Sequence, residues 1–298
     1  MRAGADGFLG RRPGRRDRRR PQGVAGGDSP LRDHIYFGHA FKGQHGARAL
    51  LSRFVEGGGT LLDLEYLVDA DGRRVAAFGY WAGYVGAALA VLEHRGLLEP
   101  DMQRRSKADL DALLRQGADG PVVRALVVGA LGRSGRGACD ALVAAGIEPT
   151  RWDLAETRDL DKAALLGHDI LVNCVMVSSP APPFVTEEDL DAPSRRLSVI
   201  SDVTCDVTSD LNLLPIYDDI TTWQEPVREI RPADDASGRP AVRMIAIDNL
   251  PSLLPAEAAA TYSADLLATL LTLPDGEVWQ RARARFALAL EQEGLSAG

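Results

Sequence analysis

The sequence lacks several features that mark whole classes of protein. No apolar run approaches the roughly 18 residues of a membrane-spanning helix, and the N-terminus has neither the apolar segment nor the small-residue cleavage site of a secretory signal. We therefore expect a cytoplasmic protein that does not enter a membrane. Only three cysteines are present, Cys139, Cys174 and Cys205, and no CxxC pair indicates zinc or redox chemistry. We expect buried thiols and no metal site.

Acidic residues outnumber basic ones outside the first twenty residues. Residues 1–20 hold eight arginines and two aspartates, a local charge of +6, so the remainder carries −14 while the whole chain carries −8. Such an acidic body is not expected to bind nucleic acid. The stretch RRPGRRDRRRPQG has no interleaved aromatic residue and no helical periodicity. It therefore predicts a disordered or non-native leader over 1–28 rather than a segment that binds RNA or anionic lipid.

From residue 29 onward the composition is that of an ordinary folded protein. The whole chain has 298 residues and 45% hydrophobic content, which suffices for one large domain or two ordinary ones. The stretch GTLLDLEYLVDADGRRVAAFGYWAG alternates apolar and polar residues around the turn at 69–72, which predicts two antiparallel strands in a hairpin. The segment 84–98 predicts a helix that ends at Gly96, and a polar stretch over 99–121 follows it.

From residue 122 onward, predicted strands and helices alternate. The expected strands are 122–128, 150–153, 169–177, 196–203 and 242–249, and the expected helices are 133–145 and 160–167. Strands separated by single helices run parallel, with right-handed crossovers. The order predicts an α/β fold with a doubly wound, parallel, Rossmann-like sheet. The final stretches AEAAATYSADLLATLLTL and EVWQRARARFALALEQE predict two more helices.

Three glycines mark the junction between the first of these strands and its helix. Gly129, Gly132 and Gly135 in GALGRSG form a GxxGxxG spacing, one residue wider at the start than the usual dinucleotide fingerprint. Gly129 would allow the tight turn, Gly132 would let the backbone approach a pyrophosphate, and Gly135 would let the helix lie close to the strand. Arg133 could add positive charge. The alternative is a tight connection without a ligand.

An acidic residue follows at the expected distance. Asp153 stands 21 residues after Gly132, at the end of the next predicted strand. A carboxylate there would accept hydrogen bonds from the ribose hydroxyls of NAD and repel a 2′-phosphate, which favours NAD over NADP. Asp153 could instead cap a helix, because Asp is a preferred N-cap residue.

Five blocks in one order carry a family resemblance: DHIYFGHAFKGQHG, GRRVAAFGYWAGYVGAALA, VVGALGRSGRGA, WDLAET and AIDNLPSLLPAEAA. Together they resemble the C-terminal three-quarters of the NAD-dependent, lysine-forming saccharopine dehydrogenases, over about residues 29–298. The resemblance implies an oxidoreductase of lysine biosynthesis. Such an enzyme oxidises the secondary amine of saccharopine with NAD, and water then cleaves the imine to lysine and 2-oxoglutarate. Alanine dehydrogenases share the broader architecture.

The resemblance also implies a set of substrate residues. His39 matches the family's acid–base histidine, a role that suits a pKa near neutrality, although a lone histidine is also compatible with a packed or capping imidazole. The positions that match substrate contacts are Gln44, Arg74, Phe78, Thr204, Cys205 and Asp206. Saccharopine carries three carboxylates. An arginine can bind one carboxylate with two parallel hydrogen bonds. Without the family, Arg73 and Arg74 would be solvated hairpin residues on opposite faces.

For the cofactor the resemblance implies contacts along the whole NAD molecule. The matching positions are Arg73, Gly132 and Arg133, then Asp153 and Thr157 at the ribose, and Val203, Ile247, Asp248, Asn249 and Leu250 at the nicotinamide end. Met176 stands where relatives place an aromatic contact, and its alternative is a core position.

One family feature has no counterpart in this sequence. The family has a catalytic lysine upstream of the histidine block, and at that spacing stands Arg20, which cannot supply a neutral amine at neutral pH. We hypothesise that residues 1–28 come from a wrongly started or frameshifted translation. On that hypothesis the chain binds NAD but is a poor catalyst, and it exposes apolar surface.

We therefore expect three parts. They are the leader over 1–28, an incomplete α/β substrate domain from 29–77 with 257–298, and an NAD-binding domain over 78–256. The expected partners are small molecules, with no nucleic acid and no membrane, and the oligomeric state stays open, a monomer being compatible with the sequence. Two alternatives also stay open: an amino-acid dehydrogenase of the alanine dehydrogenase type, and an NAD-binding remnant without activity.

Overall fold

Short runs of buried aliphatic residues form the central sheet. The computed structural model describes residues 29–296 except 39, 42–45 and 208. The sheet has six strands in the order β4 (Thr150–Trp152), β3 (Ala125–Val128), β5 (Ile170–Asn173), β6 (Val199–Asp202), β8 (Val242–Ile245) and β7 (Arg228–Arg231). The first five are parallel and β7 is antiparallel to β8. The predicted parallel, doubly wound sheet is confirmed, with strands shorter than expected.

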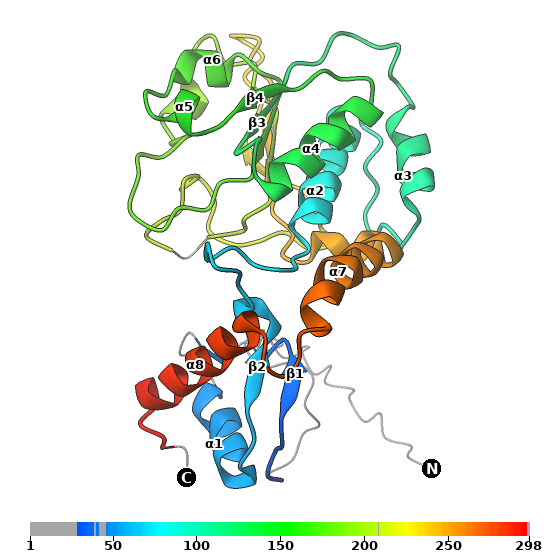
Figure 1. Cartoon of the computed structure of the whole chain (residues 1–298). Coiled ribbons are helices and arrows are strands. Elements are labelled where there is room, and N and C mark those ends of the chain that lie inside the picture. Colours follow the sequence, from blue (N-terminus) through cyan, green and yellow to red (C-terminus); the bar gives the residue numbers. More distant parts are fainter. Residues whose placement is uncertain (1–28, 39, 42–45, 208, 297–298) are drawn as a thin grey trace, which may run out of the picture. The chain divides into compact units, whose positions relative to one another are not determined.

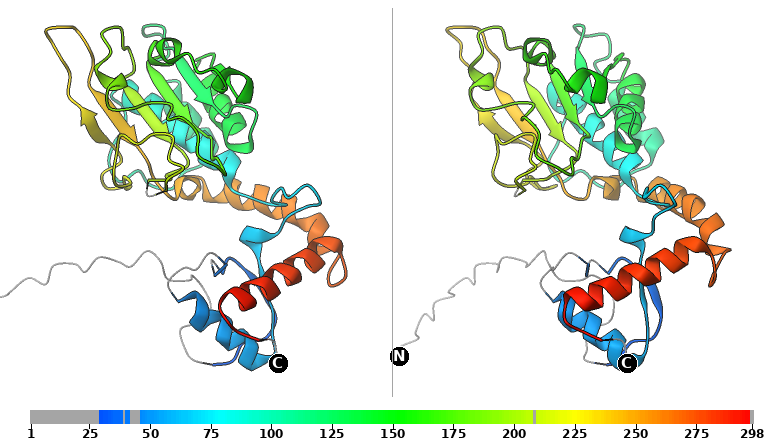
Figure 2. Two further views of the ribbon diagram at one scale, coloured as in Figure 1. Left: turned by 90° about the vertical axis from the view of Figure 1, so that its left-hand side faces the viewer. Right: turned by 60° about the vertical axis from the view of Figure 1, so that its left-hand side comes forward.

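Both faces of this sheet are covered, as a parallel sheet requires. On one face, Ala125 and Val127 pack in a core with α2 (Gly79–His94) and α4 (Arg133–Ala144). On the other face, Leu126 and Val128 belong to a second core. This core includes side chains of α6 (Lys162–Leu166) and of the 3-10 helix η2 (Asp189–Asp191), while the short α5 (Leu154–Thr157) directly follows β4. The strict alternation along β3 follows from the two-residue period of a strand. Figure 2 shows the strands between these layers.

Helices α2 and α4 lie side by side with their backbones in close contact (Figure 1). A Cβ atom added to Gly83 would lie 1.8 Å from the Ser134 carbonyl oxygen, and one added to Gly137 would lie 1.9 Å from that of Tyr80. Only glycine fits at these two positions. Helix α2 is buried around most of its circumference, so it shows no single apolar stripe. For this reason its first turn was not predicted, and the helix begins at Gly79 rather than at residue 84.

The predicted hairpin is wrong except for its turn. The Asp69 N–H donates to the Arg73 carbonyl oxygen at 2.9 Å, and Val68 and Arg74 form one antiparallel bridge. Before the turn, β2 (Leu61–Asp63) pairs in parallel with β1 (His34–Tyr36) and leads into the 3-10 helix η1 (Leu64–Tyr66). After it, the chain enters α2. The alternation of apolar residues here arises from burial in different elements.

Several elements were not predicted, among them β1 and α1 (Ala47–Gly57) and the following two of the larger unit. Helix α3 (Lys107–Leu114) lies in the polar stretch 99–121 and begins with a capping box between Ser106 and Asp109. It buries only Leu110 and Leu114, too few apolar residues to mark the stretch as a helix. Strand β7 has the sequence REIR and lies at the edge of the sheet, so its charged side chains hide the strand pattern.

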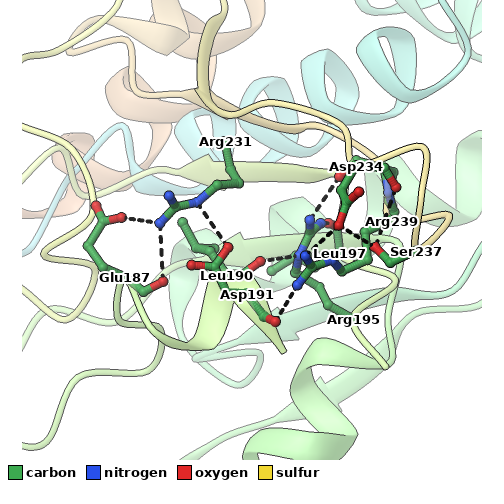
Figure 3. A network of polar contacts seen from close by, with 10 residues as sticks. Glu187, Leu190, Asp191, Arg195, Leu197, Arg231, Asp234, Ser237 and Arg239 are labelled. Atoms are coloured by element: carbon green, nitrogen blue, oxygen red, sulfur yellow. Dashed lines mark hydrogen bonds and ion pairs between the residues drawn. The ribbon is translucent and has the colours of Figure 1, made fainter. Parts of the chain in front are cut away.

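A network of arginines stabilises the connections beside β7 (Figure 3). The guanidinium of Arg195 is buried and donates to the backbone carbonyl oxygens of residues 190, 197 and 240. Arg239 donates to Asp234 Oδ2 at 2.7 Å, and Arg231 donates to Glu187 Oε2 at 2.6 Å. These contacts join η2, β7 and the loop at 234–239, so they hold the outer part of the sheet together.

By its contacts the chain divides into two units, 77–264 and a second unit of 1–76 with 265–298. Helix α7 (Pro255–Leu270) spans one boundary. The boundaries expected from the sequence lie at 77/78 and 256/257, and the assignment of the parts as functional domains remains a prediction. None of the helices in the described part of the chain combines the length and apolar character needed to cross a membrane.

The described part of the second unit is built on β1, β2, α1 (Ala47–Gly57) and α8 (Glu277–Gln292). Helix α1 buries Ala47, Leu50, Leu51 and Phe54, the i, i+3, i+4, i+7 pattern of one helix face. It ends at Gly58, whose φ of 60° is the left-handed conformation typical of a glycine after a helix. These side chains pack with Leu61 and with Phe286 of α8.

Candidate functional site

The turn after β3 has a backbone conformation that requires glycine. Gly129 has a φ of 80°, and an added Cβ would lie 2.9 Å from Val175 Cγ2 and 3.1 Å from the carbonyl carbon of Cys174. The amides of Gly129 and Ala130 both donate to the Trp152 carbonyl oxygen, at 2.8 and 3.0 Å. The turn is therefore fixed between the ends of β4 and β5.

The other two glycines bring bare backbone to the start of α4. A Cβ on Gly135 would lie 2.0 Å from the Gly129 carbonyl oxygen, so the helix begins directly against the turn. Gly132 is exposed, and a Cβ there would meet only that same oxygen, at 3.2 Å. The first hydrogen bond of the helix runs from the Arg136 N–H to the Gly132 carbonyl oxygen. The N–H groups of 133–135 lie before this bond, in the first turn of the helix and at the positive end of its dipole.

A second helix begins at the same place. A Cβ on Gly79, the first residue of α2, would lie 3.0 Å from Ser134 Oγ. The N-terminal ends of α2 and α4 are therefore neighbours, and their dipoles add positive potential at one point. Phe78 precedes α2 and stacks on Tyr262, with ring centroids 4.6 Å apart. This convergence favours an anion beside the glycine turn.

Asp153 lies beside this turn. Its Oδ2 accepts a hydrogen bond from the Leu131 N–H at 3.0 Å, and its Oδ1 accepts one from the Leu154 N–H at 2.9 Å. It also caps α5, where its own N–H donates to Glu156 Oε2. The two interpretations of Asp153, ribose ligand and helix cap, are thus geometrically compatible, because a carboxylate has lone pairs for further donors. Thr157 follows, with its hydroxyl bonded to the Asp153 carbonyl oxygen.

Exposed apolar side chains follow the carboxyl ends of three neighbouring strands. Leu131 is 74% exposed, Leu154 69% and Met176 71%. The core alternative for Met176 is wrong, because its side chain lies in solvent. Leu131 and Leu154 were not predicted as candidates. Only their positions in the sequence could have marked them as candidates. Leu131 lies inside the glycine turn, and Leu154 directly follows Asp153.

A buried polar network lies at the ends of β5 and β6. Asp202 and Asn173 are both 1% exposed, and Asn173 Nδ2 donates to Asp202 Oδ1 at 3.1 Å. The Thr204 hydroxyl donates to the same oxygen at 2.7 Å, and the Tyr217 hydroxyl donates to Asp202 Oδ2 at 2.7 Å. Asp202 was not predicted as a candidate. Its signal is a carboxylate at the last position of an otherwise uncharged strand.

The loop after β6 contains three of the predicted substrate contacts. Thr204, Cys205 and Asp206 are half-buried, and Cys205 has a φ of 51°. Burial and the neighbouring Asp202 raise the pKa of the Cys205 thiol. The expectation of buried thiols holds for Cys139, whereas Cys174 and Cys205 are only half-buried, because both follow strand ends at the open edge of the sheet.

The predicted nicotinamide positions follow β6 and β8. Val203 directly follows β6, and its N–H donates to the Asn173 carbonyl oxygen at 3.0 Å. Ile247 and Leu250 are buried, while Asp248 and Asn249 are exposed. Asn249 Oδ1 accepts a hydrogen bond from Trp223 Nε1 at 2.9 Å.

The candidates thus fall into two groups. One edge of the sheet brings together the glycine turn, Asp153 and the loops after β5, β6 and β8, at the point where neighbouring crossovers diverge from β3 and β5. Open α/β sheets bind ligands at such a switch point. Arg73 and Arg74 belong to the other unit and are exposed, and Arg73 lies 3.7 Å from Asp71 in a solvated ion pair. His39 and Gln44 lie outside the described residues.

The residues at this edge fit a dinucleotide. The backbone at Gly132 is open, two helix N-termini converge beside it, and the Asp153 carboxylate adjoins the turn. The chemistry of these donors and acceptors suits a pyrophosphate and a ribose without a 2′-phosphate. Within the described residues, no His, Cys, Asp and Glu side chains form a cluster that could hold a metal ion.

Comparison with known proteins gives close relatives. No protein-family model matches the chain. Saccharopine dehydrogenase [NAD(+), L-lysine-forming] of Neurospora crassa is 43% identical over 279 residues, which is 87% of this chain and 74% of the relative. The protein of the same name from Schizosaccharomyces pombe is 40% identical over 288 residues, 89% of this chain and 77% of the relative.

Solved structures share the fold. An L-alanine dehydrogenase superimposes with a TM-score of 0.53 at 17% identity, covering 86% of this chain and 70% of its own. A transhydrogenase from Sinorhizobium meliloti gives a TM-score of 0.52 at 16% identity, covering 84% and 72%. At these identities the likeness concerns the fold alone.

Proposed function

Because the chain belongs to the family of NAD(+)-dependent, L-lysine-forming saccharopine dehydrogenases, we propose that it converts saccharopine to L-lysine and 2-oxoglutarate. The observation that carries this proposal is the 43% identity that extends over 87% of the chain. The reaction consumes saccharopine, NAD(+) and water and yields lysine, 2-oxoglutarate, NADH and a proton. NAD(+), when bound, accepts the hydride from the carbon next to the secondary amine.

The cofactor would be held at the carboxyl edge of the sheet. Gly132 and the amides of 133–135 would bind the pyrophosphate, with Gly129 and Gly135 shaping the turn and Arg133 adding charge. Asp153 and Thr157 would contact the ribose. The exposed side chains of Leu131, Leu154 and Met176 offer apolar surface to the adenine. Arg73, Val203 and the segment 247–250 complete the predicted contacts.

The substrate residues would bind carboxylates and move protons. Arg74 would bind a carboxylate of saccharopine with two parallel hydrogen bonds, Phe78 would pack against its carbon chain, and Gln44 and 204–206 would supply further contacts. His39 would take the proton from the amine nitrogen before hydride transfer and release it to solvent, and would later move the proton of the hydroxyl that water forms at the imine carbon to the departing amine nitrogen. These assignments rest on the family pattern.

The test is turnover by the purified chain. We expect saccharopine-dependent formation of NADH, followed by its absorbance, and lysine and 2-oxoglutarate in equal amounts. Alanine is the control substrate, and turnover of alanine alone would replace the proposal by an alanine dehydrogenase-like activity. Binding of NADH without turnover of either amino acid would leave a cofactor-binding protein and refute the enzymatic proposal.

We also propose that small molecules are the partners of the chain. The charge of −14 outside residues 1–20 supports this proposal, because it disfavours contact with the phosphates of nucleic acid. A shift assay with duplex DNA at low salt tests it, and we expect no complex.

A further inference from the structure

The carboxylate of Asp202 is buried directly beneath the loop at 203–206, which contains the predicted nicotinamide contact Val203 and the predicted substrate contacts 204–206. Its side chain lies at the last position of β6 and is 1% exposed, so it does not reach a bound substrate. It carries no ion pair with a basic side chain among the described residues, yet four donors point at it. A buried carboxylate satisfied in this way is held in one orientation.

The first two of these donors come from the loop itself. The Thr204 N–H donates to Asp202 Oδ1 at 3.0 Å, and the Thr204 hydroxyl donates to the same atom at 2.7 Å. The next residue, Cys205, has a φ of 51°, and its thiol donates to the Asp202 carbonyl oxygen at 3.4 Å. A residue other than glycine persists in this left-handed region only where its surroundings fix it. The hydrogen bonds of Asp202 with Thr204 and Cys205 are restraints of this kind.

The other two donors come from different segments. Asn173, at the end of β5, donates to Asp202 Oδ1, and its own Oδ1 accepts the Val175 N–H at 3.1 Å. Tyr217, in the connection between β6 and β7, donates to Asp202 Oδ2. Because Val175 lies against Gly129, the network extends toward the glycine turn. One carboxylate therefore joins three segments at the edge where the cofactor would bind.

We propose that Asp202 is a positioning residue, which holds the loop 203–206 in the conformation that meets the nicotinamide and the substrate. The inference rests on the proposed function for the identity of the substrate. It concerns geometry and not charge. Oδ1 has three donors and must be an oxygen, whereas the single partner of Oδ2 is a hydroxyl that can also accept. The amide of Asp202→Asn can therefore preserve every hydrogen bond without the charge.

The test compares two variants of Asp202 with a matched control. Asp202→Ala removes all four hydrogen bonds, whereas Asp202→Asn can keep all four, with the bond to Tyr217 reversed so that the new amide donates to the hydroxyl. The control is Asp169→Ala, because Asp169 is 7% exposed and accepts hydrogen bonds from the Arg124 N–H and from Arg196 at the opposite edge of the same sheet. Each full-length variant is measured by amide hydrogen exchange of 203–206, by steady-state kinetics with saccharopine and by NADH titration.

We expect Asp202→Ala to accelerate exchange at 203–206 by about tenfold or more and to lower kcat/KM for saccharopine by about tenfold or more, mainly through KM. NADH affinity should stay within about threefold, because the pyrophosphate turn keeps its own contacts. Asp202→Asn should stay within about threefold of the parent in exchange and kinetics. Asp169→Ala should lower thermal stability without a selective effect on 203–206.

Three results would overturn the inference. Equal exchange and kinetics in Asp202→Ala and Asp169→Ala would make Asp202 a structural residue only. Asp202→Asn as impaired as Asp202→Ala would assign the effect to charge. Should Asp202→Ala not fold, Tyr217→Phe replaces it, and unchanged exchange at 203–206 in that variant would also refute the proposal. If the parent chain binds NADH without oxidising saccharopine, the proposed function fails, whereas the exchange data still decide the role of Asp202.

Discussion

Two buried side chains of opposite charge in the same unit are both satisfied by uncharged hydrogen-bonding groups. Asp202 collects four donors around an anion at the edge that holds the candidate site. Arg195 directs its guanidinium to three backbone carbonyl oxygens around a cation, beside the outer strand β7 (Figure 3). Neither uses an opposite charge as its partner. The difference lies in what they hold: Arg195 joins segments of the scaffold, whereas Asp202 holds a loop with unusual backbone geometry. Hydrogen bonds from uncharged groups to a buried charge thus contribute to stability at Arg195 and to the geometry of the site at Asp202.

Removing Arg195 should produce the largest loss of stability. Arg195→Ala leaves three carbonyl oxygens without their donor, and each buried acceptor without a partner costs about 1–3 kcal/mol. We expect the free energy of unfolding to fall by about 3 kcal/mol or more, measured by urea denaturation. The control is Arg228→Ala on β7, whose ion pair with the exposed Asp218 contributes at most about 1 kcal/mol. A raised KM for saccharopine at unchanged stability would contradict the distinction between the two networks.

Asp153 and Asp161 sharpen the comparison at the level of helix caps. Asp153 caps α5 beside the glycine turn, and Asp161 caps α6, where it accepts the Ala164 N–H at 2.9 Å. Either change to alanine should cost about 1 kcal/mol of stability. Only Asp153→Ala should weaken NADH binding, by about tenfold, because only Asp153 adjoins the turn. Equal NADH affinities in a calorimetric titration of both variants would remove Asp153 from the site.

The smallest of the expected effects concerns the rate at which the three thiols are chemically labelled. Burial raises the pKa of Cys139, Cys174 and Cys205 above its ordinary value. A raised pKa keeps each thiol protonated at pH 8, so we expect iodoacetamide to label the native chain about tenfold more slowly than the urea-unfolded chain. In Asp202→Ala, labelling of Cys205 should accelerate while that of Cys139 does not. Rapid labelling of all three in the native chain would contradict the raised pKa of these thiols.

The parts of the fold that depend on local sequence could be predicted. The glycine turn, the position of Asp153 after β4 and the parallel direction of β3, β4 and β5 follow from neighbouring residues and from the alternation of strands and helices. The family resemblance is likewise confirmed by relatives about 40% identical.

The parts that depend on distant contacts could not be predicted. Asp202 receives donors from Asn173 and Tyr217, which are 29 and 15 residues away in sequence. The start of α2 has no amphipathic signal because the helix is buried all round, and β7 is a strand only because β8 offers a partner. The roles of the candidate site residues stay predictions in both units.

The two outer strands of the sheet have a consequence for association between molecules. Strand β4 is three residues long and contains Arg151, and strand β7 contains Arg228, Glu229 and Arg231. A short strand or a charged one is a poor template for a further strand, because docking would bury its charges. The unpaired backbone groups of these two edge strands are therefore disfavoured as sites where molecules would join into a continuous β-sheet.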